Sequence, residues 1–534
     1  MTFSGFAFLF LWIRVVVALS RGVIMAEAKL IALPIQKFPG NPVVEDRLLQ
    51  QRRSQSIKNK APLTFFGEAY DHDVLFRGLG THYVTLYVGC NDNPQPQTVI
   101  VDTGSSRTGF PCSPSCTGQC GQGHHLHPLY DETLSECLEV VTEADCTTNQ
   151  FQNGQCRASA YYAEGSGWEG FQVMDTVRIG SDSAQEDAAT IEFTCQDFIS
   201  NLFLTQLADG ITGLSKSSRS LANQLYNQGT IDRQQFSLCV LNEQNAQSNA
   251  GMLVLGGTDA RLHNSPMVYA MERGSSWSSF WRVKIEKIYG VVGEDVLSSS
   301  SWVNGEAAWT VDEWATASLE DISVSNLLPI VDSGTTDTYF HYSLEAPMRD
   351  IWNQLTNTNG ISFDAFSYRS DVVDQLPTFI FQLQGTGDND LDLPTVIQDP
   401  DFQFQGLDSI LVAFPPSAYL QLRSSSYRRR FYFDSGRPVL GANWLSGKNV
   451  LFDQENNRIG FSMSDCILNE GDTFPPTETA SDPPTLFPTT TFSPTSTPQQ
   501  RGTGDDGSSL SCRWSVYMGV WSSSLLMLCF GLLS

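Results

Sequence analysis

One short motif occurs twice in this chain and constrains its fold more than any other feature. Each copy has an apolar run, then Asp, a hydroxyl residue, Gly and another hydroxyl residue. The copies are Val99–Ser106 and Pro329–Thr336. A single copy would be weak evidence, because Asp and Gly are common turn residues. Two copies, each after a strand-like run, predict two equivalent halves of one fold.

The glycine of each motif allows a sharp turn directly after the strand, where a Cβ atom would clash. The turn brings each aspartate, Asp102 or Asp332, to the rim of its own half. If the halves pack about a pseudo-twofold axis, the two carboxylates meet. Two carboxylates at hydrogen-bond distance cannot both ionise at low cost, so they share one proton and titrate as a pair.

A pair of carboxyls that shares one proton predicts hydrolysis. The charged carboxylate takes a proton from a water molecule held between Asp102 and Asp332, and the neutral one donates to the carbonyl oxygen of the bond that breaks. This is general acid–base hydrolysis of a peptide bond without a covalent intermediate, and it calls for no metal and no cofactor. Ser105 and Thr335 are expected to hydrogen-bond the outer carboxylate oxygens and fix their orientation.

The charge balance excludes one class of partner. The chain has 58 acidic and 32 basic residues, which gives a net charge of -26. Proteins that bind nucleic acids cluster Lys and Arg to neutralise phosphates. We therefore expect no nucleic acid partner.

The two ends of the chain differ in composition from its body. Residues 1–28 are mostly apolar and predict a signal peptide cleaved near residue 20 or 28, with an uncleaved anchor as the alternative. Residues 29–78 form the only basic stretch and are interpreted as a pro-segment, with a solvated linker as the alternative. Residues 469–511 are rich in Pro, Thr and Ser, which predicts an extended stalk. Residues 512–534 are mostly apolar and predict a membrane anchor, either a transmembrane helix or a GPI signal.

Between these ends the sequence predicts an all-β protein with few short helices. Short apolar runs such as Tyr83–Val88 and Met252–Leu255 are bounded by Gly, Asn, Asp and Pro, which indicates strands and tight turns. Ser220–Gly229 predicts a short helix with its apolar side chains on one face. The two motifs divide the body into an N-terminal lobe at 79–257 and a C-terminal lobe at 258–468.

Ten of the 12 cysteines lie between Cys90 and Cys466. An even number in a chain that looks secreted favours disulfides over free thiols. The eight from Cys90 to Cys195 allow many pairings and are left unassigned. A zinc site is the alternative, although the irregular spacing weighs against it. Its candidate ligands are Cys112, Cys116, Cys120, His124, His125 and His127.

Over residues 79–468 the sequence resembles the pepsin-like aspartic proteases. Besides the two Asp motifs, several segments fall in that family's order, namely Asp209–Ser215, Phe236–Leu238, Gly256–Asp259, Leu376–Pro377, Pro438–Gly441 and Phe452–Phe461. The resemblance implies a bilobal fold with pseudo-twofold lobes, a monomer, peptide or protein substrates, and Asp102 and Asp332 as the catalytic pair. The residues that support the pair are then Thr103, Gly104, Ser105, Ser333, Gly334 and Thr335. The resemblance also implies a disulfide between Cys239 and Cys466.

A Cys-rich insert from Phe110 to Cys156, followed by Tyr162–Ser166, is similar to plasmepsin V and its relatives. That similarity implies a membrane-anchored protease of the secretory pathway (endoplasmic reticulum, Golgi or cell surface) that cleaves after Arg within short basic-apolar motifs. It also implies that Tyr162 is the flap tyrosine over the substrate and that Glu164, beside Gly165 in the flap, contacts the substrate Arg. A carboxylate beside an active site would pair with a basic side chain, whereas a solvated loop Glu is the alternative.

The flap departs from the pepsin pattern at two positions. Ala163 follows the flap tyrosine, where pepsins usually have Gly. Pepsins also carry, seven residues after the first Asp, a Trp that hydrogen-bonds the flap tyrosine. Here that position is Gly109, and the next residue, Phe110, cannot donate such a bond. We therefore expect the flap tyrosine to be restrained in another way.

Three other functions compete with that of a membrane-anchored processing protease. The first alternative is a general pepsin of broad apolar specificity. The second is a pepsin-like protein that binds a partner without cleaving it, and the third is a surface adhesin. The adhesin is suggested only by the stalk and the tail. The intact motifs at Asp102 and Asp332, together with Tyr162, favour an active endopeptidase.

Overall fold

The computed structural model describes most of residues 82–466 of this 534-residue chain and one short segment before them. The described ranges are 31–37, 82–90, 92–148, 150–163, 165–179, 188–241, 250–265, 267–274, 278–292, 302–303, 306–307, 314–356, 360–365, 367–386, 409–423 and 425–466. The predicted signal peptide, stalk and membrane anchor lie outside these ranges. Within them, no helix has both the length and the apolar character needed to cross a bilayer.

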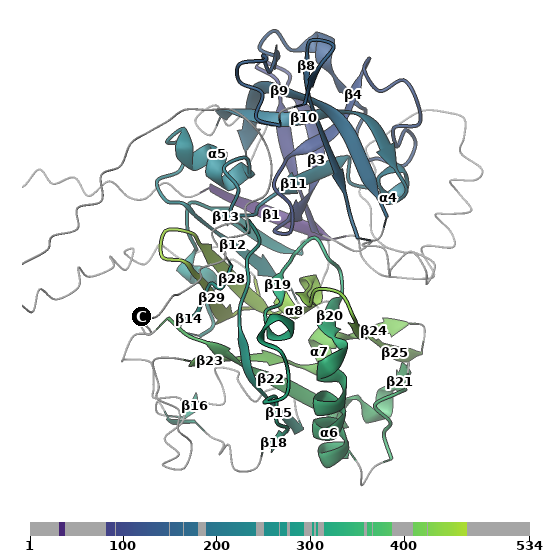
Figure 1. Ribbon diagram of the computed structural model, residues 1–534, viewed down its shortest axis with the longest axis vertical. Coiled ribbons are helices and arrows are strands. Elements are labelled where there is room, and N and C mark those ends of the chain that lie inside the picture. Colours follow the sequence, from purple (N-terminus) through teal and green to yellow (C-terminus); the bar gives the residue numbers. More distant parts are fainter. Residues whose placement is uncertain are drawn as a thin grey trace, which may run out of the picture. The chain divides into compact units, whose positions relative to one another are not determined.

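Strands dominate the described residues and the helices are short, which confirms the predicted all-β class (Figure 1). The predicted strand Tyr83–Val88 is β2 (His82–Val88), and Met252–Leu255 lies in β13 (Gly251–Leu255). The helix predicted within Ser220–Gly229 is α5 (Leu221–Asn227). Leu221 and Leu225, one helical turn apart, are both buried, as a helix with one apolar face requires.

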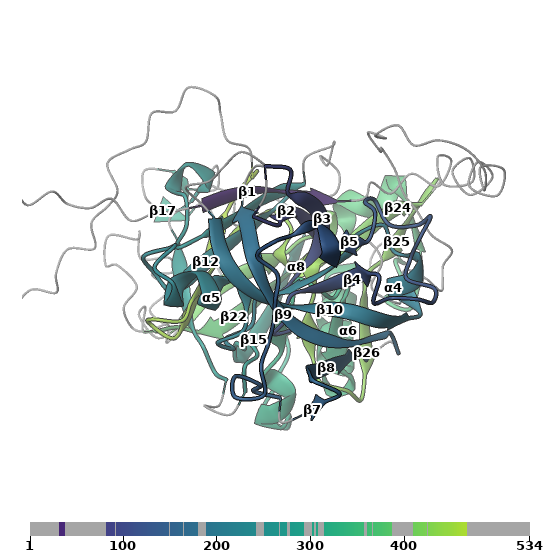
Figure 2. The same ribbon diagram turned by 90° about the horizontal axis from the view of Figure 1, so that it is seen from above.

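The strands of the N-terminal half belong to one sheet. β9 pairs with β10 along most of its length, and the start of β9 pairs with β8 to form a hairpin (Figure 2). β3 lies between β2, to which it is antiparallel, and β11, to which it is parallel. The elements are β3 (Gln95–Asp102), β4 (Gly109–Ser113), β5 (Tyr130–Asp131), β6 (Glu139–Val140), β7 (Phe151–Gln152), β8 (Gln155–Tyr161), β9 (Gly167–Ile179), β10 (Ala188–Ser200), α4 (Leu202–Thr205) and β11 (Gly210–Gly213).

Strands from both halves of the sequence meet in the middle of the molecule. β12 pairs with β13 on one side and with β28 on the other, and β28 continues to β29 and β14. These strands lie between the two halves in Figure 1. They are β12 (Gln235–Val240), β14 (Val268–Met271), β28 (Lys448–Asp453) and β29 (Arg458–Met463). The Cys239–Cys466 disulfide that the family resemblance implied joins β12 to the end of this sheet.

The C-terminal half contains several smaller sheets. One has the order β18-β15-β22-β23, a second β19-β27-β20-β26, and a third β21-β25-β24. The strands are β15 (Ile285–Val292), β16 (Trp302–Val303), β17 (Glu306–Ala307), β18 (Ala315–Thr316), β19 (Ile330–Val331), β20 (Thr338–His341), β21 (Ser367–Arg369), β22 (Pro377–Gln384), β23 (Ser409–Phe414), β24 (Leu420–Arg423), β25 (Ser426–Arg429), β26 (Phe431–Asp434) and β27 (Val439–Leu440). The helices are α6 (Glu345–Thr356), α7 (Pro416–Tyr419) and α8 (Ala442–Leu445).

The longest described helix, α6, was not predicted from the sequence. Its buried residues Met348, Ile351, Trp352 and Thr356 recur at the spacing of one helical face. It packs on β15 at Gly290, where a Cβ atom would lie only 2.2 Å from the Ile351 side chain. The glycine therefore allows the helix to approach the strand closely, and the buried periodicity is a signal that could have revealed the helix.

One strand of the predicted pro-segment is described. β1 (Ile31–Lys37) pairs with β13 from Ile31 to Ile35 and with β2 at Gln36 and Lys37. This segment is therefore part of the sheet in the described structure. The pro-segment role and the predicted lobe boundaries at 79–257 and 258–468 stay predictions.

Candidate active site

Each Asp motif follows a strand that a second, parallel strand holds in place. β3 ends at Asp102, which lies opposite Gly213 of β11, and the Leu214 N–H donates to the Asp102 carbonyl at 2.7 Å. In the C-terminal half, β19 is parallel to β27, and the Asp332 N–H donates to the Leu440 carbonyl at 2.9 Å. The two half-sites therefore use the same backbone arrangement.

The two half-sites are joined by a symmetric set of hydrogen bonds. The Thr103 hydroxyl donates to the Val331 carbonyl at 2.9 Å, and the Ser333 hydroxyl donates to the Val101 carbonyl at 2.8 Å. In return, the Ser333 N–H donates to Thr103 Oγ1 at 2.9 Å, and the Thr103 N–H donates to Ser333 Oγ at 3.1 Å. Both hydroxyl residues are buried, so these bonds are shielded from water. They fix each motif against the other.

The two carboxyl groups face one another across the motif glycines. A Cβ atom at Gly104 would lie 2.7 Å from the Asp332 carboxyl, and one at Gly334 would lie 2.2 Å from Asp102 Oδ1. Each motif can hold only glycine at this position, because the other carboxyl occupies the space. The Gly104 and Gly334 N–H groups each donate to the aspartate of their own motif at 2.8 Å.

The two aspartates differ in burial, since Asp102 is buried and Asp332 is half-buried. Asp102 is only 4% exposed, and burial together with the charge of Asp332 raises its pKa well above the usual value. The pair is therefore set to hold a proton at pH values where an ordinary aspartate is ionised.

The two expected hydroxyl supports differ in geometry. The Thr335 hydroxyl donates to Asp332 Oδ2 at 2.7 Å. The buried Ser105 hydroxyl makes no hydrogen bond of good geometry among the described residues. A weaker hydrogen bond from Ser105 to Asp102 still lowers the pKa of that carboxyl. The two half-sites thus share a backbone but differ in how their carboxyls are held.

Tyr162, the predicted flap tyrosine, stands at the turn between β8 and β9. The turn is closed by hydrogen bonds from the Tyr162 N–H to the Ser166 carbonyl at 2.8 Å and from the Gly165 N–H to the Tyr162 carbonyl at 2.9 Å. Gly165 has a φ of +93°, a conformation that favours glycine. Glu164, the proposed selector of basic residues, lies outside the described residues and stays a prediction.

A residue that sequence reasoning missed restrains this tyrosine. Trp168, on the returning strand β9, is 1% exposed, and its indole N–H donates to the Tyr162 hydroxyl at 3.3 Å. This bond takes the place of the one that Gly109 cannot provide. Two signals point to it in the sequence, namely the missing Trp at position 109 and a Trp six residues after the flap tyrosine.

Apolar side chains surround the flap tyrosine. The Tyr162 and Phe203 rings lie 5.4 Å apart, and Tyr162 packs against a buried cluster. The buried members of the cluster are Tyr83, Ile100, Ala158, Trp168, Ile199, Phe203, Ala208 and Ile211. Ile100 lies two residues before Asp102, so this apolar environment extends to the strand that carries the first aspartate.

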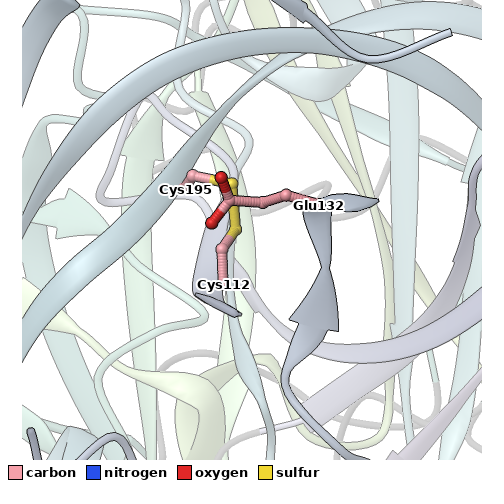
Figure 3. Close-up of side chains that lie close together, drawn as sticks. All are labelled: Cys112, Glu132 and Cys195. Atoms are coloured by element: carbon pink, nitrogen blue, oxygen red, sulfur yellow. A yellow bond between two sulfur atoms is a disulfide. The ribbon is translucent and has the colours of Figure 1, made fainter. Parts of the chain in front are cut away.

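The cysteines between Cys90 and Cys466 are all disulfide-bonded. The pairs are Cys90–Cys137, Cys112–Cys195, Cys116–Cys120, Cys146–Cys156 and Cys239–Cys466. The sulfur atoms of the alternative zinc site are therefore used in disulfides and are not free to act as thiolate ligands. The Glu132 carboxylate lies beside the Cys112–Cys195 disulfide (Figure 3), where it accepts a hydrogen bond from the Ser115 N–H at 3.1 Å.

Comparisons with known proteins agree with this geometry. A family model described as "Xylanase inhibitor N-terminal" matches residues 83–257. The chain is 25% identical over 413 residues to "Aspartic protease 5" of Toxoplasma gondii, which covers 72% of this chain and 36% of that protein. It is 23% identical over 461 residues to gastricsin of Mus musculus, which covers 82% of this chain and 97% of gastricsin. A 175-residue match to procardosin-A of Cynara cardunculus is 32% identical and covers 32% of this chain and 30% of that protein.

The chain thus spans about a third of the Toxoplasma relative and nearly all of gastricsin. Strand-rich halves that each contribute one Asp-Thr/Ser-Gly turn to a shared site define a class of two-lobed β proteins. This arrangement and the similarities to named aspartic proteases, with gastricsin and renin among the relatives, agree with the resemblance to the pepsin-like aspartic proteases. Similarity to the plasmepsin V group stays a prediction.

Proposed function

We propose that this protein is an aspartic endopeptidase and that Asp102 and Asp332 are its catalytic pair. The observation that carries the proposal is the interlocked geometry of the two motifs, in which each glycine faces the carboxyl of the opposite motif. The named aspartic proteases among its relatives support the same activity.

The geometry fits general acid–base hydrolysis. Burial and the charge of Asp332 raise the pKa of Asp102, so the pair is set to hold one shared proton, and its neutral member donates that proton to the scissile carbonyl oxygen. The ionised member of the pair takes a proton from the attacking water, and the Thr335 hydroxyl, which donates to Asp332 Oδ2, helps to orient the Asp332 carboxyl. The peptide C–N bond breaks after the water oxygen has added to the carbonyl carbon, and the departing amine receives a proton from the pair. As the carbonyl forms again, a hydroxyl group of the tetrahedral intermediate returns one proton to the pair, which restores the shared proton.

The direct test is peptide cleavage by the full chain and by the Asp102→Asn and Asp332→Asn variants. Each variant should lose at least about a thousandfold in kcat, because a single carboxyl cannot supply both an acid and a base. Thermal unfolding shows whether the variants are folded. Turnover close to the wild-type rate in either folded variant would contradict the mechanism.

A second candidate function is peptide binding without cleavage. The family model that matches residues 83–257 carries the name of an inhibitor, and that name is what favours this alternative. Both aspartates and Tyr162 are present, which favours the enzyme. Tight binding of peptides by the wild type, without any product over a wide pH range, would support the second candidate.

The surroundings of Tyr162 bear on substrate choice. We propose that an apolar substrate side chain lies near the scissile bond, because the cluster around Tyr162 and Phe203 is apolar. Selection of a basic residue by Glu164 is a separate proposal that rests on the sequence alone. A peptide library cleaved by the wild type and by Glu164→Ala tests both, since the variant should lose any basic preference and keep the apolar one.

The disulfides support a place in the secretory pathway. Five disulfides among the described residues are typical of a chain that folds in an oxidising compartment. We propose that the protein is tethered there by residues 512–534, as a transmembrane helix or through a GPI anchor.

A further inference from the structure

The Cys-rich insert contains a turn whose structure depends on a histidine ring. The His124 and His125 N–H groups both donate to the Gly121 carbonyl at 3.0 Å. Gly121 has a φ of +79°, and a Cβ atom at this position would lie 2.1 Å from the His125 ring. The ring therefore lies directly over the glycine. The Cys116–Cys120 disulfide closes the chain immediately before this turn.

Three consecutive residues at the end of this turn, His125 to His127, hydrogen-bond to one segment, residues 203–209. His125 Nε2 lies 2.8 Å from the Phe203 carbonyl oxygen, and the Leu126 N–H donates to the Leu207 carbonyl at 2.9 Å. His127 donates its backbone N–H to Asp209 Oδ1 at 2.8 Å, and its Nδ1 lies 2.7 Å from Oδ2 of the same carboxylate. The insert is therefore bonded along the whole segment.

This segment connects the flap tyrosine to the first half-site. At one end, the Phe203 ring lies 5.4 Å from the Tyr162 ring. At the other end, Asp209 leads directly into β11, whose Gly213 lies opposite Asp102. The Asp209 carboxylate is buried and also accepts the Thr98 N–H at 2.6 Å, which ties the segment to β3. A displacement of the segment would therefore shift both the contact with Tyr162 and the strand opposite Asp102.

We propose that the turn Gly121–His127 braces Phe203 against Tyr162, and that His125 is a positioning residue for the flap tyrosine. This inference rests on the proposed function. A carbonyl oxygen only accepts hydrogen bonds, so His125 Nε2 carries the proton and donates it to Phe203. Burial lowers the pKa of His125, which is consistent with a neutral ring that donates from Nε2. Leu126 packs against the same apolar cluster as Tyr162, which extends the brace.

The test compares three variants of the full chain in peptide cleavage. His125→Leu removes the donor, and kcat/KM should fall about tenfold, because a small misplacement of Phe203 misplaces the flap tyrosine. His125→Gln keeps an N–H of similar reach and should recover most of the activity. His124→Leu, at the exposed neighbouring position, is the matched control and should resemble the wild type. If His125→Leu does not fold, His125→Asn replaces it, because the shorter amide cannot reach the Phe203 carbonyl.

A double-mutant cycle separates positioning from a merely structural role. Phe203→Leu keeps the carbonyl that His125 bonds but removes the ring that contacts Tyr162. If His125 acts through that ring, His125→Leu should change kcat/KM less than twofold in the Phe203→Leu background. Multiplicative losses in the double variant would overturn the inference, and so would wild-type kcat/KM in His125→Leu.

Binding of a peptide inhibitor with a hydroxyl at the scissile position provides a readout that does not need turnover. Its Kd should also weaken about tenfold in His125→Leu. A wild type that binds this inhibitor but cleaves no peptide would overturn the proposed function alone. A wild type that cleaves peptides while His125→Leu matches it in both Kd and kcat/KM would overturn the brace alone.

Discussion

The two halves of the site share one backbone plan but are stabilised in different ways. Five residues after its aspartate, the N-terminal motif has Arg107, which pairs with Glu192 at 3.3 Å in a partly exposed position. The equivalent residue of the C-terminal motif is Asp337, which pairs with Arg430 at 2.6 Å, and both side chains are at most 6% exposed. Equivalent positions thus carry opposite charges in different environments. The symmetry that unites the two Asp-Thr/Ser-Gly turns does not extend to the residues behind them.

Disulfides and aromatic packing divide between the halves in the same way. Four of the five described disulfides lie within the N-terminal half, and the fifth, Cys239–Cys466, joins the central sheet. In the C-terminal half, the described core behind the motif is built of packed rings, with Phe431 contacting Phe340, Phe379 and Tyr419. We infer that disulfides hold the loops of the first half, whereas a continuous aromatic core holds the second.

The largest expected effect comes from breaking the buried ion pair of the second half. Arg430→Met removes the charged partner of the buried Asp337 carboxylate, which should lower the free energy of unfolding by about 3–5 kcal/mol. Arg107→Met is the matched change in the first half, and it should cost less, about 1–3 kcal/mol, because its ion pair is partly exposed and the main loss is the hydrogen bond to the buried Gln172 side chain. Chemical denaturation of both variants measures the difference. Equal losses would show that the two positions are energetically equivalent after all.

A second prediction concerns the sheet that joins the halves. Lys448, in β28 opposite Val240 of β12, is 2% exposed, and burial lowers its pKa to about 7. Between pH 7 and the ordinary lysine pKa, the unfolded chain holds a proton that the folded chain lacks, so the free energy of unfolding should rise with pH. The rise should be about 4 kcal/mol over this range, because the slope is at most about 1.4 kcal/mol for each pH unit and is smaller near the two pKa values.

Lys448→Met removes the titrating group and should remove that rise. The variant also leaves the Trp444 and Ser446 carbonyls without their Lys448 donor, so its absolute stability is less informative than its slope. The measurement is denaturant unfolding at pH 7 and pH 10 for both proteins. An identical pH dependence in the wild type and in Lys448→Met would show that Lys448 does not titrate in this range.

A smaller effect should separate the two catalytic turns. Thr335→Val removes the hydroxyl that donates to Asp332 and should lower kcat about tenfold, the effect of losing one hydrogen bond to a charged group. Ser105→Ala removes a hydroxyl whose hydrogen bond to Asp102 has poor geometry, and kcat should fall less than about threefold. Steady-state kinetics of both variants measure the ratio. Equal losses would mean that Ser105 supports its aspartate as Thr335 does.

The sequence predicts the symmetric part of this molecule well and the asymmetric part poorly. Repeated motifs with glycine turns require the same backbone twice, so the paired carboxyls could be predicted from the two motifs and the apolar runs before them. The Cys112–Cys195 disulfide and the Asp337–Arg430 pair join residues far apart in the sequence, and the Trp168 bond to Tyr162 depends on how the β8–β9 turn folds back. A single sequence shows which of these residues can pair, but the fold decides which of them meet.

The last prediction tests whether the difference in burial between the two half-sites affects the protonation of the two carboxyls. Because burial and the charge of Asp332 raise the pKa of Asp102, the folded chain keeps a proton that the unfolded chain releases above about pH 4. The stability from this group is complete below that pH and is lost as the pH rises through the raised pKa. Asp102→Asn, which cannot titrate, should therefore become more stable relative to the wild type as the pH rises from 4 to 7.

Asp332→Asn separates the two causes of the raised Asp102 pKa, because it removes the charge of Asp332 and leaves Asp102 buried. If burial is the larger cause of the raised pKa, the Asp332→Asn protein should keep most of the wild-type loss of stability with rising pH. Thermal unfolding of the wild type and both variants, at several pH values from 4 to 7, distinguishes the two causes. A flat profile in Asp332→Asn would mean that repulsion between the carboxyls, rather than the unequal burial of the two half-sites, sets the protonation of the pair.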